Sequence, residues 1–124
     1  MRKLTMVRWR DEPEDDDYPA ASSYLTLLYD PATVRSHIRA LRRAPRVEYA
    51  AKDLLRASAL PLLPLTNTHV RRDEKKIVKG LKLSPLLLVR DPDHGRLVIA
   101  DGYHRLCAVY AFDEDAVIPC KIVG

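Results

Sequence analysis

The chain has 124 residues, of which 47% are hydrophobic and 31% charged, a composition that fits one globular domain and excludes a disordered chain. It has no apolar run near the roughly 20 residues that span a bilayer, and its two cysteines are too few for a disulfide framework. No apolar stretch follows the basic start at residues 1–5, so no signal peptide is predicted. We expect a cytoplasmic protein with reduced thiols and no membrane contact.

The net charge of +4 conceals an uneven distribution along the chain. Six carboxylates lie within residues 11–17, so the rest of the chain, with 21 basic and 11 acidic residues, carries a net charge of +10. A basic body favours anionic partners such as a nucleotide, a nucleic acid or an acidic protein. Ordinary solubility, with the acidic run neutralising the body, is the alternative.

The first part of the chain is predicted to contain two segments. Residues 1–19 hold the acidic run and two prolines, a composition typical of a loop or flexible arm. Residues 20–59 are expected to form a helical extension with two or three helices. The helical spacing of Tyr24, Leu27 and Leu28 indicates the first of them.

Start and stop signals bound the second helix. Asp30 is a candidate N-cap followed by Pro31, and Pro45 ends the helix. A basic stripe runs along this helix and just past its end: Arg35, Arg39, Arg42 and Arg46. The stripe could bind nucleic-acid phosphates, or it could be a solvated face covered by the acidic run. A third helix is predicted over residues 47–59, with an apolar side formed by Ala50, Leu54 and Ala57.

Residues 60–124 are predicted to form a small mixed α+β domain that packs as one compact unit with the extension. The proline-bracketed segment 61–64 is expected to be an edge strand. A polar connection and a charged helix over residues 71–79 follow, with Ile77 and Val78 facing inward. Glycine at position 80 is the predicted stop of this helix.

The last third of the chain carries the clearest pattern. Short apolar runs at residues 86–89 and 97–100 predict two strands, joined by a turn of hairpin length at residues 91–95. A helix is expected over residues 103–112. The final strand is predicted over residues 117–123, and its proline indicates an edge position in the sheet.

The turn from the strand at 97–100 into the next helix carries the residues best suited to binding chemistry. Gly102 lets a ligand approach the backbone, and the first N–H groups of a helix lack internal acceptors. His104 and Arg105 add donors at the positive end of the helix dipole, where a cation is locally unfavourable. This combination predicts an anion site suited to phosphate. The alternative is that Asp101 caps the helix and that Arg105 pairs with Asp101 or with an acid at residues 113–115.

The box Asp-Gly-Tyr-His-Arg at residues 101–105, together with the order of the flanking elements, resembles the ParB/sulfiredoxin superfamily over about residues 60–123. Further matching segments are Leu62 to Leu65, Asn67, Ile77 to Gly80, Ser84 to Val89, and Ile118 with Pro119. The resemblance implies a nucleoside triphosphate ligand, ATP or CTP, with or without magnesium. It implies phosphate binding by Gly102, Tyr103, His104 and Arg105, aided by the loop that holds Asn67 and His69.

The box departs from both well-known members. Tyr103 takes the place of the sulfiredoxin cysteine, so peroxiredoxin repair is not expected. The second arginine of the ParB box is absent and no helix-turn-helix segment follows in this sequence, so a chromosome-partitioning clamp is not expected either. Some related proteins with a similar Asp-Gly-His-His-Arg box phosphorylate small molecules such as free serine.

Three functions remain open from the sequence. The first is a nucleotide-binding regulatory or accessory domain, the second a small-molecule phosphotransferase using ATP, and the third a nucleic-acid-binding accessory protein. In the second, the catalytic base would be one of three carboxylates: Asp101, Asp73 or Glu74. Cys107 and Cys120 are expected to be buried small hydrophobes, and no histidine spacing predicts a metal site.

Overall fold

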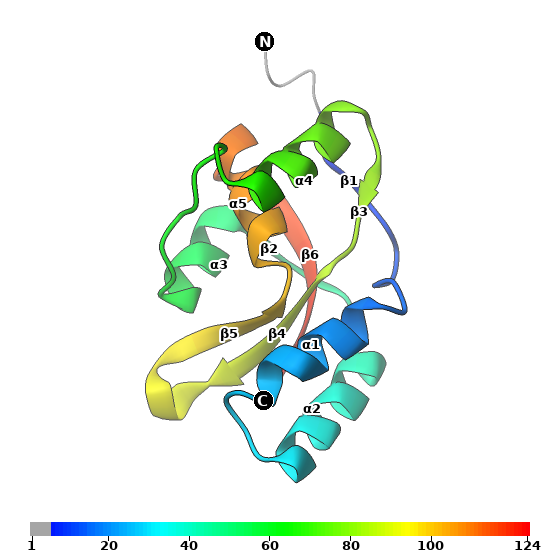
Figure 1. Cartoon of the computed structure of the whole chain (residues 1–124), viewed down its shortest axis with the longest axis vertical. Helices are drawn as coiled ribbons and strands as arrows, with labels where there is room; N and C mark the ends of the chain where they lie inside the picture. The colour runs from blue at the N-terminus through cyan, green and yellow to red at the C-terminus, as the bar shows by residue number, and fades with distance from the viewer. Residues whose placement is uncertain (1–5) are drawn as a thin grey trace.

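The computed structural model describes residues 6–124 and confirms the predicted α+β class (Figure 1). The start of the chain, which carries the signal-peptide prediction, lies outside the described residues. The elements in chain order are β1 (Arg8–Trp9), α1 (Asp17–Leu25), α2 (Pro31–Arg43), β2 (Val47–Ala50), α3 (Ala51–Ser58), α4 (Thr68–Val78), β3 (Lys82–Leu83), β4 (Leu86–Asp91), the 3-10 turn η2 (Pro92–His94), β5 (Arg96–Asp101), α5 (Tyr103–Phe112) and β6 (Val117–Val123). Within residues 6–124, no helix is long and apolar enough to cross a membrane.

A four-stranded mixed sheet of order β2-β6-β4-β5 forms the centre of the molecule. The predicted hairpin of β4 and β5 is antiparallel, β6 runs parallel to β4, and β2 closes the far edge antiparallel to β6. The prediction that the final strand lies at an edge is wrong, because β6 sits between β2 and β4. Pro119 is tolerated there because the ladder with β4 begins one residue later, at Cys120.

Two helical layers cover the two faces of this sheet. Helices α1 and α2 pack on the face that carries Leu87 and Val89 of β4. Helices α3, α4 and α5 pack on the opposite face, which carries Leu86 and Leu88. Side chains alternate along a strand, so a strand buried on both faces reads as the continuous apolar run seen in β4.

The N-terminal half differs from its prediction in where its helices begin and which residues face inward. Helix α1 begins inside the acidic run, because a carboxylate at Asp17 suits a helix N-terminus and Pro19 is tolerated in the first turn. Its buried residues are Tyr18, Ala21 and Leu25. Leu27 and Leu28, whose spacing indicated this helix, lie in the turn that follows it and are exposed. Helix α2 follows its prediction, from Pro31 to its end before Pro45.

The third predicted helix is half strand. Val47–Ala50 forms β2 because it pairs with β6, a partner about 70 residues away that local spacing does not reveal. The helix α3 begins only after this strand, and its Ala57 is exposed rather than inward. The predicted extension and the C-terminal domain therefore share one sheet.

Two further corrections concern the chain between α3 and β3. Residues 61–64 form a loop rather than an edge strand, since proline cannot donate to a ladder. Helix α4 begins at Thr68, earlier than predicted, because the Asn67 side chain accepts hydrogen bonds from two first-turn N–H groups. Ile77 is buried as expected, but Val78 is exposed.

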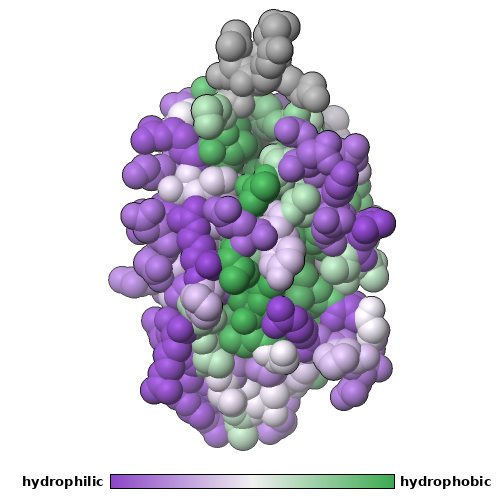
Figure 2. All heavy atoms as spheres, turned by 180° about the vertical axis from the view of Figure 1, so that it is seen from behind, coloured by the Kyte–Doolittle hydropathy of each residue, from purple (hydrophilic) through white to green (hydrophobic). Residues whose placement is uncertain are grey.

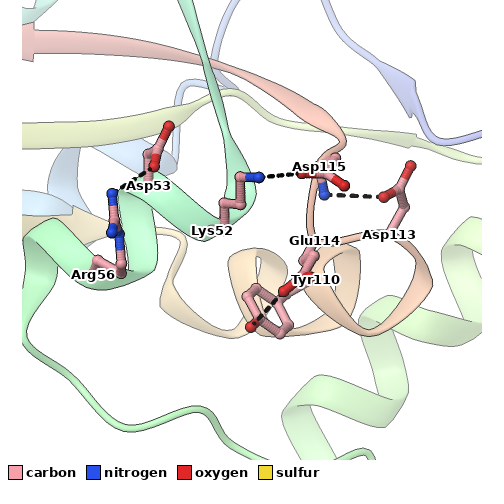
Figure 3. Close-up of polar contacts among 7 residues, drawn as sticks. All are labelled: Lys52, Asp53, Arg56, Tyr110, Asp113, Glu114 and Asp115. Atoms are coloured by element: carbon pink, nitrogen blue, oxygen red, sulfur yellow. Dashed lines mark hydrogen bonds and ion pairs between the residues drawn. The ribbon is translucent and has the colours of Figure 1, made fainter.

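Polar contacts fasten the start of α3 to the loop between α5 and β6 (Figure 3). Lys52 pairs with Asp115, and the N–H of Ala51 donates to the carbonyl of Ala116 at 2.8 Å. The hydroxyl of Tyr110 donates to Glu114 at 2.9 Å. These contacts hold one end of α3 and leave its other end beside the β4–β5 hairpin.

Candidate functional site

A small polar pocket of about 170 Å³ lies between α4 and the first turn of α5. Helix α4 contributes His69 and the residues three, four and seven positions after it, which lie on one face of the helix. The pocket is lined by His69, Arg72, Asp73, Lys76, Asp101, Gly102, His104 and Arg105. It therefore brings together most of the predicted site residues.

The N-terminus of α5 borders this pocket without a side-chain cap. The predicted cap, Asp101, is wrong: Gly102 occupies the cap position with a φ of 114°, and Asp101 is the last residue of β5. The first helical backbone bond runs from Leu106 N–H to the Gly102 carbonyl. The N–H groups of Tyr103, His104 and Arg105 are therefore not used within the helix, which favours an anion here.

Gly102 is required by packing as well as by backbone angle. A Cβ atom at this position would lie 2.6 Å from Cγ of Leu86 and 3.0 Å from Nη2 of Arg105. The space that a side chain would occupy is thus filled by the protein itself. The absence of a side chain here serves the close packing of the turn on β4 rather than the approach of a ligand.

Arg105 is held by Asp101, as the alternative interpretation of the sequence expected. Its Nη2 donates to Asp101 Oδ2 at 3.0 Å and contacts the Pro85 carbonyl at 3.4 Å. Both side chains are largely buried, 16% and 18% exposed. Within residues 6–124, the Nε of Arg105 is buried without a hydrogen-bond partner. A carboxylate therefore neutralises much of this cation before any ligand arrives.

Burial shifts the protonation of three groups around the pocket. Desolvation raises the pKa of Asp73, against the attraction of Arg105 and Lys76, and it also raises the pKa of Asp101 against its pairing with Arg105. Desolvation and the neighbouring His69 lower the pKa of His104. The two imidazole rings lie 4.8 Å apart. These shifts are typical of a site that exchanges protons or binds charged ligands.

Three predicted residues lie away from the pocket lining. Asn67 is occupied as the cap of α4, and the hydroxyl of Tyr103 donates to the Pro61 carbonyl. Glu74 lies one position beyond the pocket-facing side of α4.

Arg72 and Lys76 line the pocket and were not predicted. The signal was present, because they complete one polar helix face with His69 and Asp73. Nothing in the sequence showed that this face turns toward α5.

The acidic run pairs with one member of the predicted basic stripe and not with those on α2 itself: among the described residues, Asp11 pairs with Arg46, just beyond the helix. Glu12 pairs with Lys121 instead. Arg42 lies over the ring of Tyr18 at 4.2 Å. Within residues 6–124, Arg35 and Arg39 form no ion pair.

Neither cysteine belongs to the pocket. Cys107 and Cys120 are free and buried, as expected, and burial raises the pKa of Cys120 to about 12. Thiolate chemistry is therefore strongly disfavoured at Cys120. Among the described residues, no group of three or more histidine, cysteine, aspartate or glutamate side chains could hold a metal ion.

In comparisons with known proteins, no family model, no curated protein and no solved structure matches this chain.

Proposed function

We propose that the α4–α5 pocket binds the phosphate group of a nucleotide, and that the chain is a nucleotide-binding protein of the ParB/sulfiredoxin kind. One observation carries the proposal: an uncapped helix N-terminus meets the cationic face of α4 in a single polar pocket. Phosphate is the anion that such a combination of backbone donors and cations suits best.

The balance of charge in the pocket supports an anionic ligand. Three cationic side chains face two carboxylates, which leaves one positive charge in excess. Asp101 is neutralised by Arg105, and Asp73 lies 3.9 Å from Lys76. Arg72 forms no ion pair within residues 6–124. Unlike the guanidinium of Arg105, that of Arg72 is therefore available to bind a phosphate group.

The volume limits what the pocket itself encloses. At about 170 Å³ it is smaller than the ~300 Å³ at which pockets for whole small molecules begin. A phosphate group fits this space, whereas a base and ribose would extend over the exposed side of α4. The proposal therefore assigns phosphate recognition to the pocket and makes no choice between ATP and CTP.

Ligand-induced stabilisation tests this function. The melting temperature of the whole chain is measured with inorganic phosphate, ATP and CTP, each with and without magnesium. The double variant Arg72→Gln with Lys76→Gln should weaken nucleotide binding about tenfold or more. The matched control, Arg71→Gln with Lys75→Gln, changes two cations on the same helix outside the pocket and should bind normally. Absence of stabilisation by every ligand would reject the proposal.

A second function, transfer of a phosphoryl group to a small hydroxyl compound, is favoured by the position of Asp73. Its carboxylate faces the same pocket as Arg72 and Lys76, the side chains proposed to bind the phosphate. Burial raises the pKa of Asp73, which suits a general base. Incubation with ATP and free serine should then release ADP, and Asp73→Asn should abolish the release while nucleotide binding persists. ADP release that is equal in both proteins would exclude Asp73 as the base.

A further inference from the structure

A basic surface separate from the phosphate pocket lies on the exposed side of α2. We call it the arginine face, and it is formed by Arg35, Arg39, Arg42 and Arg43. At 3.6 residues per turn, these positions fall within an arc of about 100° and span about 12 Å along the helix axis. Arg46, predicted as a member, is instead held by the carboxylates of Asp11 and Glu48.

The protein does not neutralise the arginine face by ion pairing. Helix α2 contains no aspartate or glutamate, and the one carboxylate at its start, Asp30, accepts a hydrogen bond from the hydroxyl of Thr33. Within residues 6–124, none of the four arginines forms an ion pair. The acidic run before α1 lies nearest in charge, but its ion pairs go to Arg10, Arg46 and Lys121.

Core packing fixes the direction in which the arginine face points. Val34 and Leu41, on the opposite side of α2, are buried against the sheet. The carbonyl of Arg42 accepts a hydrogen bond from the buried Lys121, and its guanidinium lies 4.2 Å from the centre of the Tyr18 ring. The arginines are therefore displayed on a rigid helix rather than on a loop.

The other exposed side chains of α2 favour a polyanion with a regular shape as the partner. They are small: Ala32, Ser36 and Ala40. Among the described residues, no exposed large apolar side chain lies on α2. Exposed apolar side chains gather elsewhere, in the middle of the molecule seen from behind (Figure 2). An acidic protein would be expected to dock on such apolar or aromatic anchors, and single-stranded nucleic acid on aromatic rings.

We propose that the arginine face binds the phosphates that border the major groove of duplex DNA. A helix with its side chains is about 10–12 Å across and the groove is about 12 Å wide, whereas the major groove of an RNA duplex is too deep and narrow. The small side chains let the helix approach closely. Contacts to phosphates carry no sequence information, so binding is independent of sequence.

This proposal does not depend on the proposed nucleotide-binding function. Helices α2 and α4 lie at opposite ends of the molecule (Figure 1). A DNA phosphate could nevertheless enter the α4–α5 pocket, so the variant Arg72→Gln with Lys76→Gln is included in the DNA experiment. It should bind DNA as the unmodified chain does, and loss of DNA binding in this variant would overturn the proposal.

The salt dependence of binding counts the phosphate contacts. The anisotropy of a labelled DNA duplex of ~20 base pairs, about two helical turns, is measured with the whole chain. Four contacts predict a slope of about −3.6 for log affinity against log salt, which is about a hundredfold loss between ~50 and ~200 mM salt. In the triple variant Arg35→Gln, Arg39→Gln and Arg43→Gln, the slope should fall to about −0.9 and the affinity at low salt should fall about tenfold or more.

A matched variant separates position from total charge. Lys75→Gln with Lys79→Gln and Lys82→Gln removes three exposed cations far from the arginine face. It should keep the slope and most of the affinity of the unmodified chain. Equal losses in the two triple variants would show that net charge alone attracts DNA, and would overturn the proposal.

The position of the DNA is tested with one substitution at two sites. Ala40→Glu places a carboxylate beside Arg39 and Arg43 and should weaken binding about tenfold, whereas Ala57→Glu, on the exposed side of α3, should not. In the unmodified chain, the labelled methyl group of Ala40 should shift when DNA is added, while that of Ala57 stays in place.

Four further results would overturn the proposal. They are absence of DNA binding at low salt, an Ala40 methyl that does not shift, and displacement of the labelled DNA by an RNA duplex or by polyglutamate as efficient as that by unlabelled DNA. The RNA result would make the partner RNA, and the polyglutamate result would make it an acidic protein. None of these results bears on the thermal-shift test of nucleotide binding.

Discussion

Two basic side chains, those of Lys121 and Arg105, are buried on opposite sides of the same sheet, and they differ in how completely their donors are paired. Lys121 of β6 lies beneath α1 and α2, where its Nζ contacts the Tyr18 hydroxyl at 3.3 Å and the Arg42 carbonyl at 3.2 Å. It also pairs with Glu12 at 3.0 Å. Arg105, at the α5 N-terminus, has one carboxylate and leaves its Nε without a partner.

The difference separates a structural charge from one in a candidate site. Nζ of Lys121 has three acceptors for its three protons, so nothing remains to bind a ligand. The region of Arg105 holds more donors than acceptors, including three unused backbone N–H groups. Nε of Arg105, buried without a partner among the described residues, calls for an explanation, and the phosphate ligand proposed above would place an acceptor in this region.

The largest effect expected from this comparison is on the turn that supports Arg105. Gly102→Ala should destabilise the fold by about 4 kcal/mol, from an unfavourable positive φ and from overpacking against Leu86. Gly95→Ala is the control, because its φ is also positive but no atom lies within 4 Å of the added Cβ. Urea unfolding of both variants gives the two free energies. Equal losses would show that packing at Gly102 is not special.

The next effect concerns the ion pair itself. Arg105→Ala leaves the Asp101 carboxylate buried without its cation, so the free energy of unfolding should fall by about 3 kcal/mol. The double variant Arg105→Ala with Asp101→Ala should recover part of this loss, because neither charge then remains. A double variant no more stable than Arg105→Ala would mean that the pair itself does not matter. Urea unfolding at neutral pH measures all three proteins.

The sequence predicted best those elements whose structure depends on interactions between neighbouring residues. The segment from Leu86 to Phe112 was predicted almost to the residue, because a hairpin turn and the following helix depend on neighbouring residues. The strand at Val47–Ala50 was missed because only its distant partner β6 makes it a strand.

The candidate site was predicted in part for the same reason. Gly102, His104 and Arg105 stand next to one another in the sequence, so their turn could be recognised. Arg72 and Lys76 reach the pocket only through the packing of α4 against α5, which no local pattern encodes. The sequence allowed Arg105 either to bind a ligand or to pair with an acid such as Asp101. Only the folded structure shows that the pair with Asp101 forms and is largely buried.

A smaller effect is expected from the second carboxylate of the pocket. Burial raises the pKa of Asp73 above its ordinary value of 3.8, so the folded state holds the proton more tightly than the unfolded state. The stability that this carboxyl provides is complete below pH 3.8 and is lost as the pH rises through the raised pKa. Asp73→Asn should therefore be more stable than the unmodified chain at pH 7, and the gain should vanish in acid.

Thermal unfolding of both proteins at pH 3 and at pH 7 measures this gain in stability. The exposed Asp93→Asn, on the hairpin turn, is the control and should show no gain at either condition. A loss of stability in Asp73→Asn at neutral pH would mean that the carboxylate is needed by Lys76 and Arg105, and that the pocket is a structural ion-pair network like the Lys121 cluster.

The smallest effect is expected on the other face of the sheet. Lys121→Met removes a side chain that is only 4% exposed, yet the carboxylate that it leaves behind, Glu12, is 68% exposed and can be solvated by water. The lost hydrogen bonds to Tyr18 and Arg42 are offset by burial of an apolar side chain of similar length, so stability should change by less than about 1 kcal/mol. Urea unfolding beside Arg105→Ala decides the comparison. A loss as large as that of Arg105→Ala would show that a fully satisfied buried charge matters as much as an unsatisfied one.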